Sequence, residues 1–433
     1  MRRVLGAALV ASVLACPVLV GPVLAPSAAE ADDGVEADCA NIPVQDTTHY
    51  ATSRPSLPLQ EMGVDDALAR LKQQHVKPGA GVTVAVIDSG VANQAPVRIA
   101  GRVDAGNKQA EPLDYHGTAV AGLIAGRPRT DGGGAVGIAP WARIYDVQVY
   151  DEADASTAPD STESPITVDN VRQGLDAVIS AVPTLGIKIV NISLAIPADD
   201  QIKAQIARLR DLGVVVVAPT GNRSELPPGT PSTFEAHTSG EDAAPYVHPA
   251  DYDHVLGVNA SPEGSTDPNP TRWVLENSMT DVAAPTALGV SYSLRGESCL
   301  LGDPATSYAA AEVSGVLALL QSVYDESVAA SVQRLLTTAN GRSDIPNTLV
   351  GAGEVQAMDA LTRPMVIDDG GTDLVAGGVE HQPQLLTVPK KPDDVLASTR
   401  KDAVWWGLLG GGVLLFAVLV RPVLARRRRT LSG

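Results

Sequence analysis

Aromatic residues are scarce in this chain. Phe, Trp and Tyr together make up 3% of its 433 residues, and only two are phenylalanines. A folded core therefore has to be built from Ala, Val, Leu and Ile, and a hydrophobic content of 44% allows one. Basic residues are also outnumbered, 32 against 50 acidic ones, giving a formal net charge of −18. Such a surface repels phosphate backbones, so we exclude nucleic acid as a partner.

The N-terminus has the pattern of a secretory signal peptide, which we place at residues 1–31. Arg2 and Arg3 precede an apolar run over residues 4–25, and small residues at 27–29 are followed by acidic ones. A basic start, an apolar segment and a small-residue cleavage zone are the three parts of such a signal. Two alternatives are an uncleaved membrane anchor and a lipid attached to Cys16.

The C-terminus contains a second apolar run, residues 403–420, with no charge in 18 residues. A helix of this length spans roughly 27 Å, enough for the hydrocarbon core of a bilayer. Trp405 and Trp406 lie at one edge, and Arg421 with the arginines at 426–429 follows the other. Clustered arginines stay on the cytoplasmic side. We therefore predict a linker over residues 366–402, a transmembrane helix over 403–421 and a cytoplasmic tail over 422–433. The protein would cross the cell membrane once, with its main domain extracytoplasmic.

Cysteine is nearly absent, with one residue in the apolar start and two more at Cys39 and Cys299. Disulfides persist outside the cytoplasm, so these two either form a bridge or remain as free or intermolecular thiols. A bridge would tie the N-terminal segment to the rest of the protein. Neither cysteine has the spacing or the histidine partners of a metal site, and no carboxylate cluster is distinctive. We expect no metal and no cofactor.

Between the two ends, a polar extension over residues 32–61 precedes one large domain over residues 62–365. A helical pattern covers residues 62–74. Continuous apolar runs predict strands buried on both faces, and helical stretches alternate with them. The strands are expected at 82–87, 144–150, 187–193, 214–218 and 255–258, and the helices at 117–125, 168–181, 198–212 and 307–324. This alternation predicts a three-layer α/β fold with a central, mostly parallel sheet.

Three short motifs put an acid, a base and a nucleophile at the ends of these elements. Asp88 ends the best predicted strand and is followed by Ser-Gly, His116 opens a helix as His-Gly-Thr, and Ser307 begins another helix. Histidine is basic enough to take a serine proton near neutral pH, and an aspartate fixes its tautomer. The chain order Asp, His, Ser is the one found in subtilisin. We interpret the three as a catalytic triad.

A fourth group follows the strand expected at 214–218. Asn222 comes after Gly221, where a side-chain amide could donate a hydrogen bond to a developing oxyanion. Such a donor contributes roughly 2.7–4 kcal/mol to transition-state stabilisation. A simple Gly-Asn turn is the structural alternative.

The motifs Asp88-Ser-Gly, His116-Gly-Thr, Gly221-Asn222 and Thr306-Ser307 together resemble the subtilisin-like (S8) serine proteases, over roughly residues 62–361. The resemblance implies a serine endopeptidase acting on protein or peptide substrates. It also implies that the backbone of Ser193, Leu194 and Ala195 binds the substrate beside the specificity pocket. Signal, extension, protease domain, linker, membrane helix and arginine tail together resemble the mycosins, the membrane-anchored proteases of actinobacterial type VII secretion systems. That likeness implies processing of secreted substrates and partners in the secretion membrane complex.

The chain departs from the usual family pattern near the nucleophile and the cleft. Ala305 and Ala311 replace a glycine and a proline around Ser307, while Ala195 and Thr286 stand where glycine is common. All four reacting groups remain, so we expect activity. The alternative is a catalytically weak or inactive scaffold that stabilises the secretion complex. An esterase is disfavoured, because no Gly-x-Ser-x-Gly motif surrounds Ser307.

Overall fold

The computed structural model of the chain describes residues 35–367, apart from short internal gaps, together with 374–376 and 397–429. The gaps are at 46, 131–132, 154, 157, 159–160, 227–228, 235–239, 264, 266–268, 303, 342 and 344–345. The signal peptide expected over residues 1–31, the alternatives involving it, and most of the linker expected over 366–402 lie outside the described residues. The chain divides into two units between residues 377 and 378.

A seven-stranded sheet forms the centre of the first unit, in the order β2-β3-β1-β4-β5-β6-β7, and every neighbouring pair is parallel. The strands are β1 (Thr83–Asp88), β2 (Ile99–Asp104), β3 (Arg143–Gln148), β4 (Ile187–Ile192), β5 (Val215–Pro219), β6 (Val255–Ser261) and β7 (Val282–Pro285). The predicted α/β fold with a central parallel sheet is confirmed. All five strands expected from apolar runs are present, with ends shifted by at most three residues.

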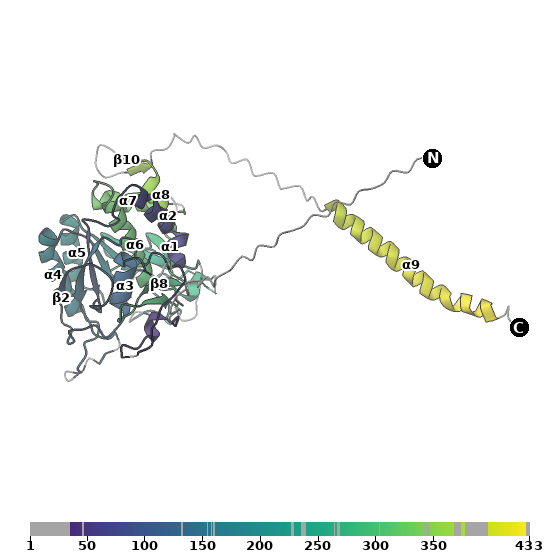
Figure 1. Cartoon of the computed structure of the whole chain (residues 1–433), viewed down its shortest axis with the longest axis horizontal. Coiled ribbons are helices and arrows are strands. Elements are labelled where there is room, and N and C mark those ends of the chain that lie inside the picture. The colour runs from purple at the N-terminus through teal and green to yellow at the C-terminus, as the bar shows by residue number, and fades with distance from the viewer. Residues whose placement is uncertain are drawn as a thin grey trace, which may run out of the picture. The chain divides into compact units, whose positions relative to one another are not determined.

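Helices cover both faces of the sheet (Figure 1). One face packs against α3 (His116–Ala125) and α6 (Thr306–Gln321), the other against α4 (Val168–Leu185) and α5 (Asp200–Asp211). Because successive side chains of a strand point to opposite faces, β1 supplies both cores. Val84 and Val86 pack with α3 and α6, whereas Ala85 and Ile87 pack with α4. A fully buried Val or Ile side chain contributes about 1.5–3 kcal/mol.

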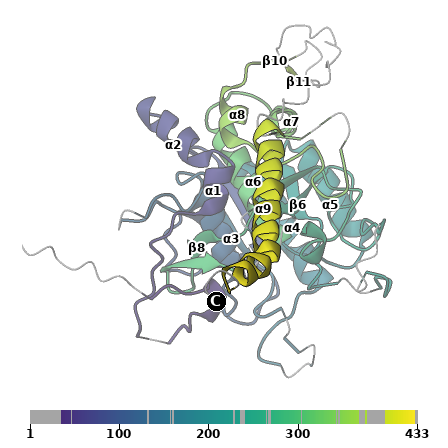
Figure 2. The same cartoon turned by 90° about the vertical axis from the view of Figure 1, so that its right-hand side faces the viewer.

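The remaining elements surround these layers. They are η1 (Cys39–Asn41), α1 (Leu57–Glu61), α2 (Val64–Gln73), η2 (Pro270–Arg272), β8 (Gly289–Tyr292), β9 (Ser298–Leu301), α7 (Val328–Thr338), α8 (Ala357–Thr362), β10 (Met365–Ile367) and β11 (Leu374–Ala376). Figure 2 shows β8, α1 and α3 on the same side of the domain.

The helix expected over residues 62–74 begins later than the pattern suggested. Met62 instead ends α1, and Gly63 adopts φ 67°, a left-handed conformation that separates α1 from α2. Glycine tolerates this conformation without steric cost, so the chain can turn between two helices here.

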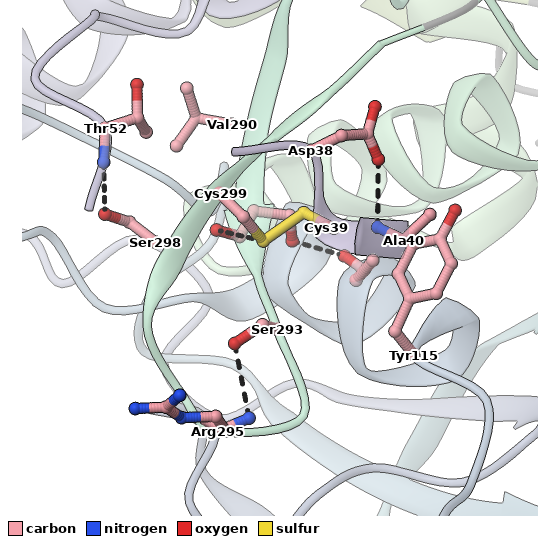
Figure 3. Close-up of a disulfide and its surroundings, with 12 residues drawn as sticks. Asp38, Cys39, Ala40, Thr52, Tyr115, Val290, Ser293, Arg295, Ser298 and Cys299 are labelled. Carbon is pink, nitrogen blue, oxygen red and sulfur yellow. Dashed lines mark hydrogen bonds between the residues drawn. A yellow bond between two sulfur atoms is a disulfide. The ribbon is translucent and has the colours of Figure 1, made fainter. Parts of the chain in front are cut away.

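The extension before α1 is fastened to the β8–β9 hairpin. Cys39 and Cys299 form a disulfide with their Cα atoms 5.0 Å apart, and both side chains are buried (Figure 3). The N–H of Leu300 donates to the carbonyl of Ala37, and the N–H of Thr52 donates to the hydroxyl of Ser298. A bridge closing a long loop stabilises a fold by about 2–5 kcal/mol. The extension is thus part of the folded domain.

The second unit contributes one described helix, α9 (Ala397–Arg429), of 33 residues. Its apolar side chains between Val404 and Leu419 are largely exposed. Of the helices in the part of the chain that the structure describes, none is both long and apolar enough to cross a membrane.

Candidate active site

The three residues of the interpreted triad meet at the carboxyl edge of the sheet. Asp88 is the last residue of β1, His116 is the first of α3, and Ser307 is the second of α6. Gly117 permits this meeting, because a Cβ there would lie 2.6 Å from the carbonyl oxygen of Gly90, in the turn after Asp88. Side chains 219 positions apart in the chain therefore converge on one point.

His116 connects the other two groups by hydrogen bonds. Its Nδ1 lies 2.9 and 3.0 Å from the two carboxylate oxygens of Asp88. Its Nε2 lies 3.0 Å from Oγ of Ser307. All three distances are within hydrogen-bond range, and that between His116 and Ser307 is short enough for proton transfer. The arrangement can move a proton from the serine hydroxyl to the imidazole while Asp88 orients the ring.

Asp88 is completely buried and held by two further donors. The N–H of Ser89 donates to its Oδ1 at 2.8 Å, and the hydroxyl of Tyr150 donates to the same oxygen at 3.2 Å. Burial and the charge of Asp88 raise the pKa of Tyr150 well above its usual value, so its hydroxyl keeps its proton. These bonds compensate for the loss of water around a buried carboxylate.

The electrostatics around His116 favour its charged form. Burial alone would lower the pKa of the imidazole, but the Asp88 carboxylate, with smaller contributions from Asp114 and Glu225, raises it to about 9. Asp114 also accepts the backbone N–H of His116 at 2.9 Å. Burial raises the pKa of Asp114 itself, against the opposing effect of His116. The base is therefore strong, but it must lose a proton before it can act.

Asn222 lies directly beside Ser307. Gly221, with φ 113°, turns the chain after β5 and presents Asn222 to the first turn of α6. Its Oδ1 accepts both the N–H and the hydroxyl of Thr306, each at 2.8 Å. The amide oxygen is thereby occupied and the Nδ2 hydrogens are directed elsewhere. A side-chain oxygen at this position also caps α6, a role that Ala305 cannot fill.

The backbone before Ser307 accommodates the departures from the family pattern. Ala305 has φ −143° and ψ 137°, an extended conformation that any residue adopts, so glycine is not required there. The N–H of Ala305 donates to Oγ1 of Thr286 at 3.1 Å. Ser193 donates its hydroxyl to the carbonyl of Ser307 at 2.9 Å.

The three residues expected to bind substrate face in different directions. Ser193 and Ala195 line a pocket of about 150 Å³ that also contains His116, Asn222 and Ser307. The side chain of Leu194 is 5% exposed and packs in the core with α4 and α5. Only the backbone of Leu194 is therefore available to a substrate.

Several residues of this site were given no functional role from the sequence. Tyr150 and Thr286 reach the site by tertiary contacts, and Thr286 was noted only as a departure from the usual glycine. Asp114 and Glu225 lie within three residues of His116 and Asn222 in the chain. Tyr308 follows Ser307 directly: its ring stacks on His116 with centroids 5.5 Å apart, and its hydroxyl lies 3.0 Å from that of Tyr115. Among the described residues, no group of three or more His, Cys, Asp or Glu side chains could hold a metal ion.

Similarity to known proteins covers most of the chain. Residues 79–353 match the model of the subtilase family. Mycosin-1 of Mycobacterium tuberculosis (strain ATCC 25618 / H37Rv) is 34% identical over 313 residues, or 66% of this chain and 69% of that protein.

Solved structures agree with this likeness. Superposition on the MycP3 protease from the type VII (ESX-3) secretion system gives a TM-score of 0.52 at 30% sequence identity. The match covers 72% of this chain and 90% of the MycP3 chain. Superposition on a chain of an intact ESX-5 inner membrane complex gives a TM-score of 0.56 at 25% sequence identity. The match covers 89% of this chain and 93% of that chain. The chain therefore belongs to the subtilase family and, within it, to the mycosins, and it is a serine-type endopeptidase.

Proposed function

We propose that Ser307, His116 and Asp88 are the catalytic triad of this endopeptidase. The observation that carries the proposal is the position of His116, whose two ring nitrogens lie 2.9 Å from Asp88 and 3.0 Å from Ser307. In this mechanism Oγ of Ser307 attacks the peptide carbonyl while His116 takes the hydroxyl proton. Asp88 keeps the imidazole in the required tautomer and stabilises its positive charge.

The tetrahedral intermediate places a negative charge on the former carbonyl oxygen. Nδ2 of Asn222 and the N–H of Ser307 would donate to it, because that N–H lies in the first turn of α6. The first N–H groups of a helix have no partner within it, and the helix dipole favours an anion there. His116 then gives its proton to the leaving amine, and water releases the acyl group by the reverse route.

The segment 193–195 is proposed to bind the substrate backbone. It follows β4 and lies outside the strand ladders, so its backbone groups can pair with an extended peptide. Main-chain hydrogen bonds to such a segment give affinity without selecting side chains.

The triad is tested with a fluorophosphonate, which phosphonylates activated serines. We expect the full chain to be labelled, and Ser307→Ala and His116→Ala to lose the label. Ser180→Ala, an exposed serine on α4, is the matched control and stays labelled. Labelling that persists in Ser307→Ala, or absence of labelling in the unmodified protein, contradicts the proposal.

We also propose that the protein acts in a type VII secretion system, processing substrates and supporting the membrane complex. The support is its similarity to the MycP3 protease from the type VII (ESX-3) secretion system and to a chain of an intact ESX-5 inner membrane complex. Secretion is compared in a strain lacking the protein and in one carrying Ser307→Ala. If secretion fails in the deletion strain but not in the Ser307→Ala strain, the protein supports the complex independently of proteolysis. If substrate stays unprocessed in both strains, Ser307 of this protein is required for its processing. Normal secretion and processing in both strains contradict the proposal.

Residues 403–421 are proposed as a single membrane anchor, with the protease domain extracytoplasmic and residues 422–433 cytoplasmic. The support is the uncharged run at 403–420 followed by the arginine cluster. The full chain should remain in membranes during alkaline carbonate extraction, whereas a chain ending at residue 396 should be released. An added protease outside the cell should digest the domain but spare a tag on the C-terminus. Extraction of the full chain, or loss of the tag, would argue against the anchor.

A further inference from the structure

The amino edge of the central sheet, opposite the candidate active site, carries a row of cations. Because the strands are parallel, the residues at their starts lie side by side along this edge. Arg98 precedes β2, Arg143 begins β3, and Lys188 is the second residue of β4. Arg143 is in register with Thr83 of β1, which in turn pairs with the start of β4. The row therefore extends over three strand spacings, roughly 14 Å.

These three cations and Lys77, which we call the basic row, are not neutralised within the described part of the chain. No carboxylate of the described residues lies within ion-pair distance of any of them. Arg143 donates to Oγ1 of Thr83 and to the carbonyl of Leu185, at 2.9 and 3.0 Å, so its guanidinium is fixed but keeps its charge. In a chain of formal net charge −18, such a patch attracts an acidic partner.

An exposed tryptophan lies within the basic row. Trp141, two residues before β3, is 39% exposed. Cζ of Arg98 lies 4.1 Å from the centroid of its ring, and Nζ of Lys77 lies 4.5 Å from it. Trp and Arg are enriched among the residues that dominate the energy of protein interfaces. Side chains already held against each other also lose less freedom on binding. The composition therefore favours a protein partner over a lipid surface.

The basic row continues into an apolar groove of about 580 Å³, because Lys188 also lines this groove. One wall is α7, which presents Val332 and Leu336, four residues apart and so on one face of the helix. Leu212, between α5 and β5, lines the groove as well and is 43% exposed. The groove thus offers partly exposed aliphatic side chains next to an unpaired ammonium group.

The other charged groups of the groove already have partners. Nη2 of Arg210 lies 2.6 Å from the carboxylate of Asp211, and Nη1 of Arg210 lies 2.7 Å from Nε2 of His254. Oδ2 of Asp281 accepts the N–H of Gly257 at 2.8 Å. Lys188 is therefore the charge in the groove that can meet a carboxylate from outside.

We propose that the basic row, Trp141 and the groove form one docking surface for an acidic amphipathic segment of a partner protein in the secretion membrane complex. Apolar side chains of the segment fill the groove, and its carboxylates pair with Lys188 and the neighbouring arginines. The inference rests on the proposed role of this protein in that complex. Because the surface lies at the edge opposite Ser307, docking leaves the candidate active site open.

The test is site-specific photo-crosslinking with an affinity-tagged full chain in a strain that lacks the untagged protein. Benzoylphenylalanine is placed at position 212 or, as the control position, at 153, which is exposed in the loop after β3 at the other edge of the sheet. After irradiation the complex is isolated in mild detergent. The probe at 212 is also combined with Lys188→Glu, with Trp141→Ala, or with the matched control Lys108→Glu, an exposed cation after β2.

We expect the probe at 212, but not at 153, to crosslink to one protein of the complex, within a segment that combines apolar residues with Asp or Glu. Lys188→Glu and Trp141→Ala should each reduce this adduct about tenfold or more, as expected for residues that dominate an interface. Lys108→Glu should leave it within about twofold. Thermal unfolding should be unchanged in all three variants; if Trp141→Ala unfolds early, Lys188→Glu alone decides.

Four results overturn the inference: an adduct with lipid, an adduct with a segment that lacks acidic residues, no protein adduct, or an adduct that survives substitution in a folded variant. Failure of the unsubstituted full chain to co-purify with the complex would instead overturn its proposed role in secretion, and the inference with it.

Discussion

The polar groups in the first turn of α6 have hydrogen-bond partners, whereas the carboxyl of Glu312 further along the same helix has none among the described residues. In the first turn, Thr306 is bonded to Asn222, the carbonyl of Ser307 accepts from Ser193, and the Ser307 hydroxyl lies against His116. Five residues after the nucleophile, Glu312 is 1% exposed, and neither carboxylate oxygen has a hydrogen-bond partner among the described residues. Burial raises the pKa of Glu312 well above its usual value.

The difference shows that the hydrogen bonds of this helix are concentrated around Ser307. The first turn must hold a reactive hydroxyl, an amide and a backbone N–H in fixed positions, so each neighbour is bonded. Ser314 in the second stretch is bonded to Asn191, but Glu312 makes no such bond, and its unsatisfied carboxyl costs stability without disturbing the site. The comparison predicts large losses of activity at the first turn and gains of stability at Glu312.

The largest effect is expected for Asn222→Ala, which removes the proposed oxyanion donor and the side-chain acceptor at the start of α6. We predict a fall in kcat of about 100- to 1,000-fold with little change in KM, since the donor acts mainly in the transition state. Steady-state kinetics with a peptide substrate measure it. A loss confined to KM would show that Asn222 binds substrate rather than the oxyanion.

The pH dependence should give the next largest effect. His116 must be neutral to act as the base, and Asp88 holds its pKa above the usual 6.5, at about 9. We therefore predict that kcat/KM rises about tenfold per pH unit from pH 6 to 8. Asp114→Asn removes a carboxylate that raises this pKa, so its profile should shift to lower pH.

The same titration affects stability in the opposite direction. A folded-state pKa above the unfolded value stabilises the fold at low pH, and this contribution is lost as pH rises through the folded-state pKa. For the activity, a kcat/KM that does not change between pH 6 and 8, or an Asp114→Asn profile that is not shifted to lower pH, would contradict the raised pKa of His116.

At Glu312 we predict a gain. Glu312→Met replaces an unpartnered buried carboxyl by an apolar side chain of similar length and should raise the free energy of unfolding by about 1–3 kcal/mol. Because the folded-state pKa is raised, the wild type loses stability as pH rises above 4.5, so the gain should be larger at pH 8 than at pH 4. Thermal unfolding at both pH values measures this. Glu312→Gln should also lack the pH dependence, and a destabilised Glu312→Met would reveal a partner for this carboxyl.

The smallest effect is expected at Thr286, which holds the backbone of Ala305. Thr286→Val keeps the shape of the side chain but removes the acceptor of a 3.1 Å hydrogen bond. We predict a two- to tenfold lower kcat, in line with about 0.5–1.5 kcal/mol for one such bond. Thr286→Ser retains the hydroxyl and should restore the rate. Equal rates in the Val and Ser variants would mean that packing alone matters at this position.

The central strands could be predicted from sequence because they are buried on both faces and read as unbroken apolar runs. β2 could not, since none of its residues is buried and two are exposed at the sheet edge. The split between α1 and α2 depends on the backbone of Gly63, which the helical pattern does not reveal. The triad motifs were visible because they end or begin regular elements. The role of Tyr150 was not, because it reaches Asp88 only through the pairing of β3 with β1. Thr286 was visible only as a departure from the usual glycine, since its bond to Ala305 depends on tertiary packing.

The disulfide between Cys39 and Cys299 would hold the N-terminal segment on the protein even after its backbone is cleaved. Residues 43–45 and 53–55 are exposed, and both stretches lie between Cys39 and α1. A nick in either place frees a new chain end, but the fragment carrying Cys39 stays tethered through sulfur. Release of this fragment requires both cleavage of the backbone and reduction of the disulfide. Gel electrophoresis of the cleaved protein with and without reductant distinguishes the two events.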